Sequence, residues 1–143
     1  MSLITLGVED LARSKAFYEA MGWRGQEVDG TVFFQAGALV VVLWGWDALA
    51  EDAGVADDPQ GRLGQFRGVA FAHNVRSPEE VDAIVATAER AGAVVTRQPG
   101  PTFYGGYAGY FADPDGHLWE VAHNPGFALG DDGTLTLPHF GRI

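Results

Sequence analysis

Apolar and polar residues alternate along the chain in a way that predicts short strands separated by helices. In the first half, residues 3–8 (LITLGV) have the pattern of a strand, and residues 9–23 place their larger apolar side chains on one face of a helix. Residues 31–37 and 38–46 have the pattern of two strands joined by a turn at Gly37. The stretch after them is polar and rich in Gly, Asp and Pro, which predicts a short helical turn and an exposed linker.

The same order of elements recurs in the second half of the chain. Residues 68–75 are a predicted strand, and residues 76–92 are a predicted helix in which Ser77, Pro78 and Glu80 supply an N-cap, a first-turn proline and a capping box. Three more strands are predicted in residues 93–99, 105–113 and 116–124. Each half therefore has the order strand, helix, strand, strand, strand, which indicates an internal duplication.

The duplication predicts one α+β domain built from two βαβββ modules. Each module alone would leave one face of its sheet uncovered, so pairing them predicts a cupped mixed sheet with helices outside and a hollow inside. The whole chain, residues 1–143, is long enough for a single domain. We place its parts at about residues 3–50 for module one, 51–66 for the linker, 67–124 for module two and 125–143 for a tail.

Charge and composition narrow the range of partners. The chain has nine Lys and Arg against nineteen Asp and Glu, a formal net charge of −10. This charge repels phosphate groups, so we expect no nucleic acid and no membrane as partner, and it attracts small cations. The chain has no cysteine, no apolar run of membrane-spanning length and no basic start followed by an apolar stretch, which predicts a cytoplasmic protein.

Two stretches carry a family resemblance, namely residues 4–23 (ITLGVEDLARSKAFYEAMGW) and 110–125 (YFADPDGHLWEVAHNP). Together with the duplication they resemble the glyoxalase/bleomycin-resistance/extradiol-dioxygenase superfamily, also called the vicinal oxygen chelate proteins. The resemblance covers about residues 3–127 and extends to proteins described only as predicted lactoylglutathione lyases. It implies two βαβββ modules around a cup in which the family's enzymes hold a divalent metal that the substrate binds through neighbouring oxygens.

The resemblance implies four positions for metal ligands, on the first and last strands of each module. They fall on Leu3, Val41, Gly68 and Glu120, of which Glu120 alone carries a side-chain donor atom. Zn, Ni, Fe and Mn sites need several N or O donors from the protein, so we expect no metal and no cofactor. His73 is the strongest substitute ligand, but strand parity places it on the face away from the cup.

Glu120 is a charged residue inside an otherwise apolar strand. Leu118, Glu120 and Ala122 share the predicted cup face, so the carboxylate faces a cavity rather than the core. Two interpretations remain open: an inherited ligand satisfied by water or by the hydroxyl of Thr5, or an anchor or general base for a bound molecule. Aromatic side chains with polar tips suit a flat, partly polar ligand, and those that we assign to the pocket are Trp44, Trp46, Tyr104 and Tyr107.

The preferred hypothesis is a protein that binds a small aromatic or cationic molecule in its cup without a metal. The alternative is a lyase or dioxygenase-type enzyme of the same superfamily, with Glu120 as acid, base or metal ligand, and a third is a protein-interaction module with a vestigial cup. We also expect a two-fold symmetric homodimer with the tail at or near the interface. Short sheets leave edges to cover, and exposed aromatic residues near Trp44 and Trp46 need a partner surface.

Overall fold

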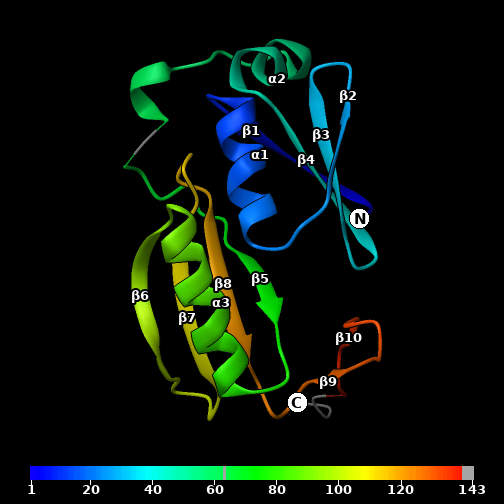
Figure 1. The fold of residues 1–143 in the computed structure, drawn as a ribbon, viewed down its shortest axis with the longest axis vertical. Coiled ribbons are helices and arrows are strands. Elements are labelled where there is room, and N and C mark those ends of the chain that lie inside the picture. Colours follow the sequence, from blue (N-terminus) through cyan, green and yellow to red (C-terminus); the bar gives the residue numbers. More distant parts are fainter. Residues whose placement is uncertain (63, 140–143) are drawn as a thin grey trace.

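The structure is a computed structural model that describes residues 1–62 and 64–139 (Figure 1). Module one contains β1 (Leu3–Val8), α1 (Leu11–Ala20), β2 (Gly25–Val28), β3 (Thr31–Ala36) and β4 (Leu39–Gly45). α2 (Trp46–Ala53) begins at the end of module one and runs into the linker, which also contains the 3-10 turn η1 (Pro59–Gly61). Module two contains β5 (Phe71–Asn74), α3 (Pro78–Ala91), β6 (Val94–Pro101), β7 (Tyr107–Ala112) and β8 (Leu118–His123), and the tail contains β9 (Ala128–Leu129) and β10 (Leu135–Thr136).

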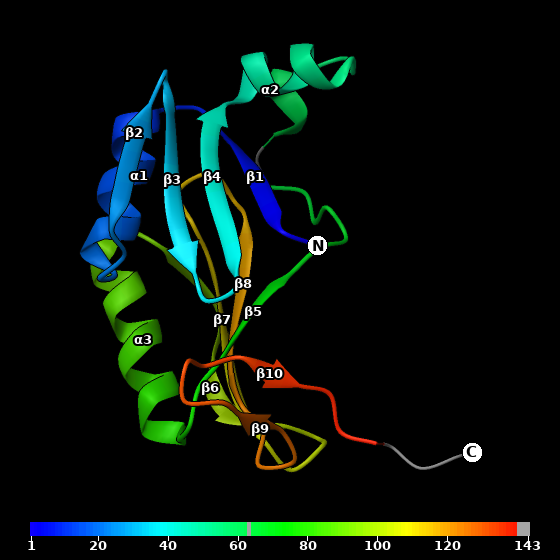
Figure 2. The same cartoon turned by 90° about the vertical axis from the view of Figure 1, so that its right-hand side faces the viewer.

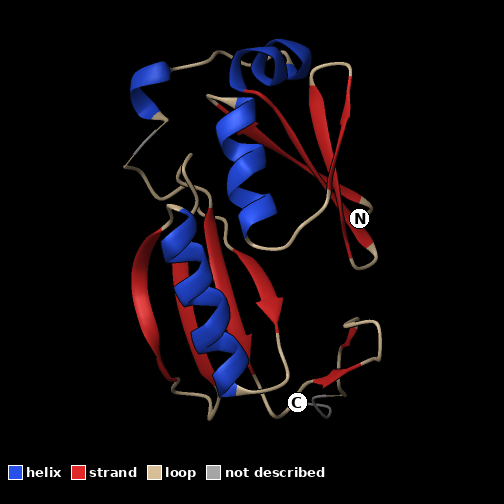
Figure 3. Ribbon diagram, in the orientation of Figure 1, coloured by secondary structure: helices blue, strands red, loops and turns tan. Residues whose placement is uncertain are grey.

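The two modules have the same topology, which confirms the predicted duplication. Each contributes a four-stranded mixed sheet, in the orders β1-β4-β3-β2 and β5-β8-β7-β6 (Figure 3). In both sheets the first strand of the module pairs in parallel with the last, and the remaining pairs are antiparallel. The described residues therefore form the predicted mixed architecture from two sheets rather than from one continuous sheet.

The two long helices cover one side of the sheets. In Figure 2, α1 and α3 lie on the same side of the strands, and the opposite face, which we call the open face, carries neither of them. A single hydrophobic core fills the space between helices and sheets and spans both modules, with Phe17, Tyr18, Phe34, Phe111 and Trp119 at its centre. Full burial of each large apolar side chain contributes about 1.5–3 kcal/mol relative to exposure, so this shared core ties the modules together.

The Asp-Pro-Asp-Gly turn of module two is hydrogen-bonded to the first helix of module one, and we call these bonds the clasp. The Asp115 carboxylate accepts hydrogen bonds from the Glu9 backbone N–H at 2.8 Å and from the Ser14 hydroxyl at 2.6 Å. The Asp113 carboxylate accepts one from the Tyr18 hydroxyl at 2.5 Å. Both carboxylates are buried. The turn therefore has a structural role, and its partners in module one are visible only in the fold.

Several element boundaries differ from the predicted ones. β5 begins at Phe71 rather than at residue 68, because Gly68 has a φ of +74° and takes the chain out of extended conformation. Trp46 begins α2 instead of ending β4. In the tail, Leu135–Thr136 pairs with Ala128–Leu129. In the described part of the chain, no helix has the length and apolarity needed to cross a membrane.

The N-terminus of α3 follows the predicted capping pattern with one change. The Ser77 side chain accepts a hydrogen bond from the Glu80 backbone N–H at 3.2 Å, and Pro78 occupies the first turn. The Glu80 carboxylate, however, accepts from the backbone N–H of Arg76 at 2.6 Å rather than from that of Ser77. The Arg76 guanidinium donates to the Leu129 and Gly130 carbonyls, so this helix start also holds the tail.

Candidate functional site

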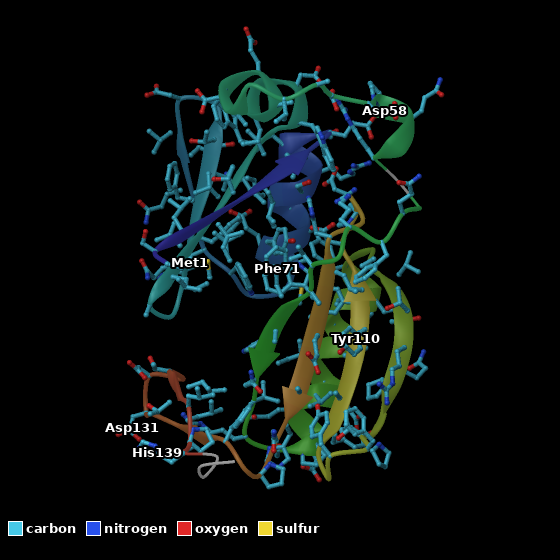
Figure 4. All side chains as sticks on the ribbon, turned by 180° about the vertical axis from the view of Figure 1, so that it is seen from behind. Met1, Asp58, Phe71, Tyr110, Asp131 and His139 are labelled. Atoms are coloured by element: carbon cyan, nitrogen blue, oxygen red, sulfur yellow. The ribbon has the colours of Figure 1, made fainter. Side chains whose placement is uncertain are left out.

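A pocket of about 500 Å³ lies where β1 of module one meets the sheet of module two, and we call it the seam pocket. Its volume is in the range that holds a small organic ligand. The strand residues that line it are Thr5, Leu6, Phe71, Thr96, Ala112 and Leu118. The structure thus places two of the predicted ligand-binding residues, Thr5 and Leu118, on its wall. Phe71 is labelled in Figure 4 at the junction of the two halves.

The linker and the clasp turn supply the rest of the pocket wall. The linker residues are Gly64, Gln65 and Phe66, the residues at the start of module two are Arg67 and Val69, and the turn residues are Gly116 and His117. Sequence reasoning treated residues 51–66 only as an exposed connection and residues 68–75 as a strand, and it assigned none of these residues to the pocket. The available signal was an aromatic residue, Phe66, inside a polar stretch rich in glycine.

Arg67 and His117 form an ordered group at the wall of the seam pocket. The Arg67 guanidinium lies 3.1 Å from His117 Nδ1 and also 3.1 Å from the Asp115 carbonyl oxygen, to which it donates. It lies over the Trp46 ring at 4.6 Å from the ring centroid, and Trp46 stacks on His117 at 5.7 Å. Trp46 in turn packs on Gly7, where an added Cβ would lie 3.1 Å from the indole ring. Gly7 therefore lets this aromatic wall approach β1 closely.

Three polar residues lie on neighbouring strands of module two, farther along β8 and β7 than the pocket-lining residues Leu118 and Ala112, and we call them the polar row. Glu120 of β8 is directly opposite Tyr110 of β7, which is directly opposite Arg97 of β6. Residues that are directly opposite each other on neighbouring strands share a face of the sheet. Figure 4 views the molecule from the side opposite the helices and shows Tyr110 over the sheet of module two. Burial raises the pKa of Tyr110, and the nearby Glu120 carboxylate raises that pKa further.

Comparison with known proteins agrees with this architecture. The family profile of the glyoxalase/bleomycin resistance protein/dioxygenase superfamily matches residues 1–121. The chain belongs to this superfamily. A glyoxalase-related enzyme from Fulvimarina pelagi is 39% identical, with a TM-score of 0.86 and coverage of 96% of each chain.

Other members of the glyoxalase superfamily are more distant. A probable lactoylglutathione lyase of Vibrio cholerae serotype O1 is 29% identical, over 90% of this chain and 93% of that protein. The structure of a lactoylglutathione lyase from Agrobacterium tumefaciens is 23% identical, with a TM-score of 0.62 over 87% of this chain and 92% of the other. The last similarity concerns the fold alone.

The side chains of this chain do not form a site for the divalent metal that the resemblance to the superfamily's enzymes implies. Within residues 1–62 and 64–139, no three His, Asp or Glu side chains are grouped so that they could hold a metal ion. Glu120 lies between Ala72 and Tyr110 across the sheet, and the β1 residues at the Leu3 and Thr5 positions offer a single hydroxyl. One carboxylate and one neutral hydroxyl are not the donor set of a zinc, nickel or iron site.

Two of the four predicted ligand positions were misplaced. Val41 is buried in the core at 4% exposure, and alternation puts Val40, Val42 and Trp44 on the open face instead. Val41 was assigned by aligning Gly37 of the β3–β4 turn with Gly116 of the β7–β8 turn. The first turn joins Ala36 to Leu39 and the second joins Ala112 to Leu118, so the turns differ in length. Aligning their glycines therefore shifts β4 by one residue relative to β8. A one-residue shift exchanges the faces of a strand. Gly68 precedes β5, and the residue beside Glu120 is Ala72.

The four aromatic residues assigned to the pocket occupy different places. Trp46 supports the pocket wall from behind Arg67 and His117, and Trp44 is half-buried in β4 opposite Thr31. Tyr104 lies in the β6–β7 loop, outside the seam pocket. The assignment of Tyr107 was wrong, because its hydroxyl donates to Asp82 of α3 at 2.8 Å on the helical side.

The histidines follow strand parity and turn geometry. His73 lies beside Trp119, Val121 and Ile84 on the helical side, as parity predicts, and partial burial lowers its pKa. His123 Nδ1 lies 3.2 Å from the Val75 carbonyl oxygen at the end of β8. Neither ring faces Glu120, so neither replaces a missing metal ligand.

Proposed function

We propose that this glyoxalase-superfamily protein binds a small, partly aromatic molecule in the seam pocket without a metal. The observation that carries the proposal is a pocket of about 500 Å³ whose wall combines aromatic and aliphatic side chains, such as Phe66, Phe71 and Leu118, with polar ones. Such a composition suits a flat organic ligand. Glu120 and Tyr110 lie two residues along their strands from the pocket-lining Leu118 and Ala112, and under the anchor interpretation they would bind polar atoms of a ligand that extends beyond the pocket.

Ligand binding should raise the thermal stability of the protein. We expect at least one member of a panel of neutral, anionic and cationic aromatic compounds to raise Tm by about 4 °C at ten times its Kd, since binding to the folded state alone then contributes about 1.4 kcal/mol. Thr96→Trp should reduce or abolish the shift by obstructing the pocket. Gln98→Trp, on the same strand outside the pocket lining, should retain it.

The metal-free part of the proposal is tested on the same samples. The Tm shift should be the same with and without a chelator, and elemental analysis should find no stoichiometric Zn, Ni, Fe or Mn. A bound metal at one equivalent, or a shift that the chelator removes, would overturn it. A panel without any stabilising compound would contradict ligand binding itself.

A second candidate function is acid–base catalysis, and the adjacency of Glu120 and Tyr110 favours it. A carboxylate beside a phenol with a raised pKa provides a proton acceptor and a proton donor in one place. The names of the relatives, a glyoxalase-related enzyme and a probable lactoylglutathione lyase, agree with an enzyme of this superfamily. Mass spectrometry of a compound recovered after incubation distinguishes the candidates, because a binding protein returns it unchanged.

We also propose that the protein is a two-fold symmetric homodimer with its tail near the interface. Light scattering at micromolar concentration should give twice the chain mass of 15.3 kDa. A chain ending at Pro125 loses the hairpin that Arg76 holds through the Leu129 and Gly130 carbonyls, and it should dimerise more weakly. A monomeric full-length protein would contradict the dimer, whereas a truncated chain that dimerises equally well would contradict only the tail's role.

A further inference from the structure

Arg67 gives the seam pocket a positive charge at one place. Among the described residues that line the pocket, it is the one Lys, Arg, Asp or Glu side chain. Its neighbours on the wall are neutral or apolar, including Phe66, Phe71 and Thr5. The formal net charge of −10 belongs to the whole chain, and salt screens charges more than about 8–10 Å apart at physiological ionic strength. The local charge of Arg67 therefore decides which groups the pocket favours at short range.

Neutral groups hold the Arg67 guanidinium in place. It donates to the backbone carbonyls of Asp115 and Arg62, lies 3.1 Å from His117 Nδ1, and rests on the face of Trp46. These contacts orient the guanidinium without cancelling its charge. In the described part of the chain, no carboxylate oxygen lies within 4.0 Å of Arg67.

The carboxylates around this end of the pocket are already engaged by other groups. Asp115 pairs with Arg13 at 3.3 Å and accepts hydrogen bonds from Glu9 and Ser14. Arg62 pairs with Asp57 and Asp47, and its hydrogen bond lowers the pKa of Asp57. Arg13 and Arg62 thus each have a carboxylate partner, whereas none is present for Arg67 among residues 1–62 and 64–139.

The hydrogen bonds of His117 determine what remains free for a ligand. A guanidinium only donates, so His117 Nδ1 must accept from Arg67, and the ring then carries its proton on Nε2 and donates to the Gly7 carbonyl at 2.7 Å. Both ring nitrogens are therefore used, which makes His117 a positioning residue for Arg67. The guanidinium uses three of its five N–H groups for His117, Asp115 and Arg62, and two remain.

We infer that the seam pocket recognises its ligand through an acidic group, bound by Arg67, on an otherwise apolar or aromatic molecule. The inference rests on the proposed function and specifies its ligand class. It departs from the cationic ligand that net charge alone suggests, because the charged group on the pocket wall is a cation. An oriented guanidinium with two free N–H groups provides charge-assisted hydrogen bonds to a carboxylate.

The test compares three probes of one shape by isothermal titration calorimetry: 2-naphthoate, 2-naphthamide and 2-naphthylmethylammonium. On the unaltered protein we expect 2-naphthoate to bind about tenfold more tightly than the amide, because the guanidinium forms charge-assisted hydrogen bonds with a carboxylate but not with a neutral amide oxygen. The ammonium compound should bind most weakly. Equal affinities, a preference for the ammonium compound, or no binding of 2-naphthoate would overturn the inference.

Variants locate the preference on Arg67. Arg67→Gln should reduce the ratio of carboxylate to amide affinity to about one while leaving amide affinity unchanged, and Arg67→Lys should keep part of the preference because it keeps the charge. Arg90→Gln, on the exposed side of α3, is the matched control and should behave as the unaltered protein. A carboxylate preference that survives Arg67→Gln would overturn the role of Arg67. Amide binding without carboxylate preference would contradict this inference alone and leave the proposed function intact.

Discussion

Replacing Phe111 with Ala is expected to lower the free energy of unfolding by about 4 kcal/mol. The ring is 2% exposed, stacks on Trp119 at 6.5 Å and lies 6.3 Å from Phe17, where the core joins the two modules. Its removal leaves a cavity that rigid strands and helices on both sides cannot close. Because domains of this size are stable by about 5–15 kcal/mol, the loss is a large share of the total.

Phe103→Ala is the matched control for this prediction. Phe103 belongs to the same module, but its side chain is fully exposed in the β6–β7 loop. We expect a change within about 0.5 kcal/mol in the same urea titrations. Equal losses for the two variants would contradict the core described for Phe111.

Tyr18→Phe is expected to lower the free energy of unfolding by about 3 kcal/mol, although it removes only one oxygen atom. The hydroxyl donates to Asp113 at 2.5 Å and accepts from Trp119 Nε1 at 3.1 Å, and both partners are buried. Without it, a buried carboxylate oxygen and a buried indole N–H have no partner. Urea titration measures the loss, and Tyr104→Phe, in an exposed loop, should change stability by less than about 0.5 kcal/mol.

The cost of Tyr18→Phe should depend on pH. Burial raises the pKa of Asp113 above its ordinary value of 3.8, so this group favours folding when protonated and that contribution is lost as pH rises through the folded-state pKa. The Tyr18 hydroxyl lowers that pKa, so removing it raises the pKa of Asp113 further. The difference between the variant and the unaltered protein should therefore be smaller near pH ~4 than at neutral pH. A constant difference would contradict an ionised Asp113 as the partner of Tyr18.

Much of the fold follows from local pattern. Alternation, the capping residues at Ser77 and Glu80 and the repeated order of elements predict two βαβββ modules, and the structure has them. The errors arise where a shift of one residue in the alignment changes the face of the strand to which a side chain is assigned. Val41 was placed on the wrong face because turn lengths differ between the modules, and a strand pattern that is apolar on both faces offers no correction.

The site was less predictable than the fold. The alternation of side chains along a strand correctly placed Glu120 on the opposite face of the sheet from Trp119 and His73, because alternation depends only on the strand itself. The seam pocket depends on where the linker packs against β1 and β8, and the hydrophobic pattern of the sequence does not predict that position. Arg67 and His117 were therefore missed as pocket residues, and Tyr107 was assigned to a face that its bond to Asp82 excludes.

The clasp bonds the turn of module two to module one, and the described residues form no equivalent bonds from the turn of module one to α3. This difference shows how the two duplicated halves have diverged. Asp113 and Asp115 of module two are buried under α1, whereas the corresponding turn of module one has only Gly37 and Ala38 between its strands. Across residues 1–62 and 64–139, no α3 side chain is hydrogen-bonded to that turn. A separated module two would lose the donors to Asp115 from Glu9, Arg13 and Ser14 and the Tyr18 donor to Asp113. Two copies of one pattern have thus become complementary halves, and we expect module two alone to be less stable than it is in the whole chain.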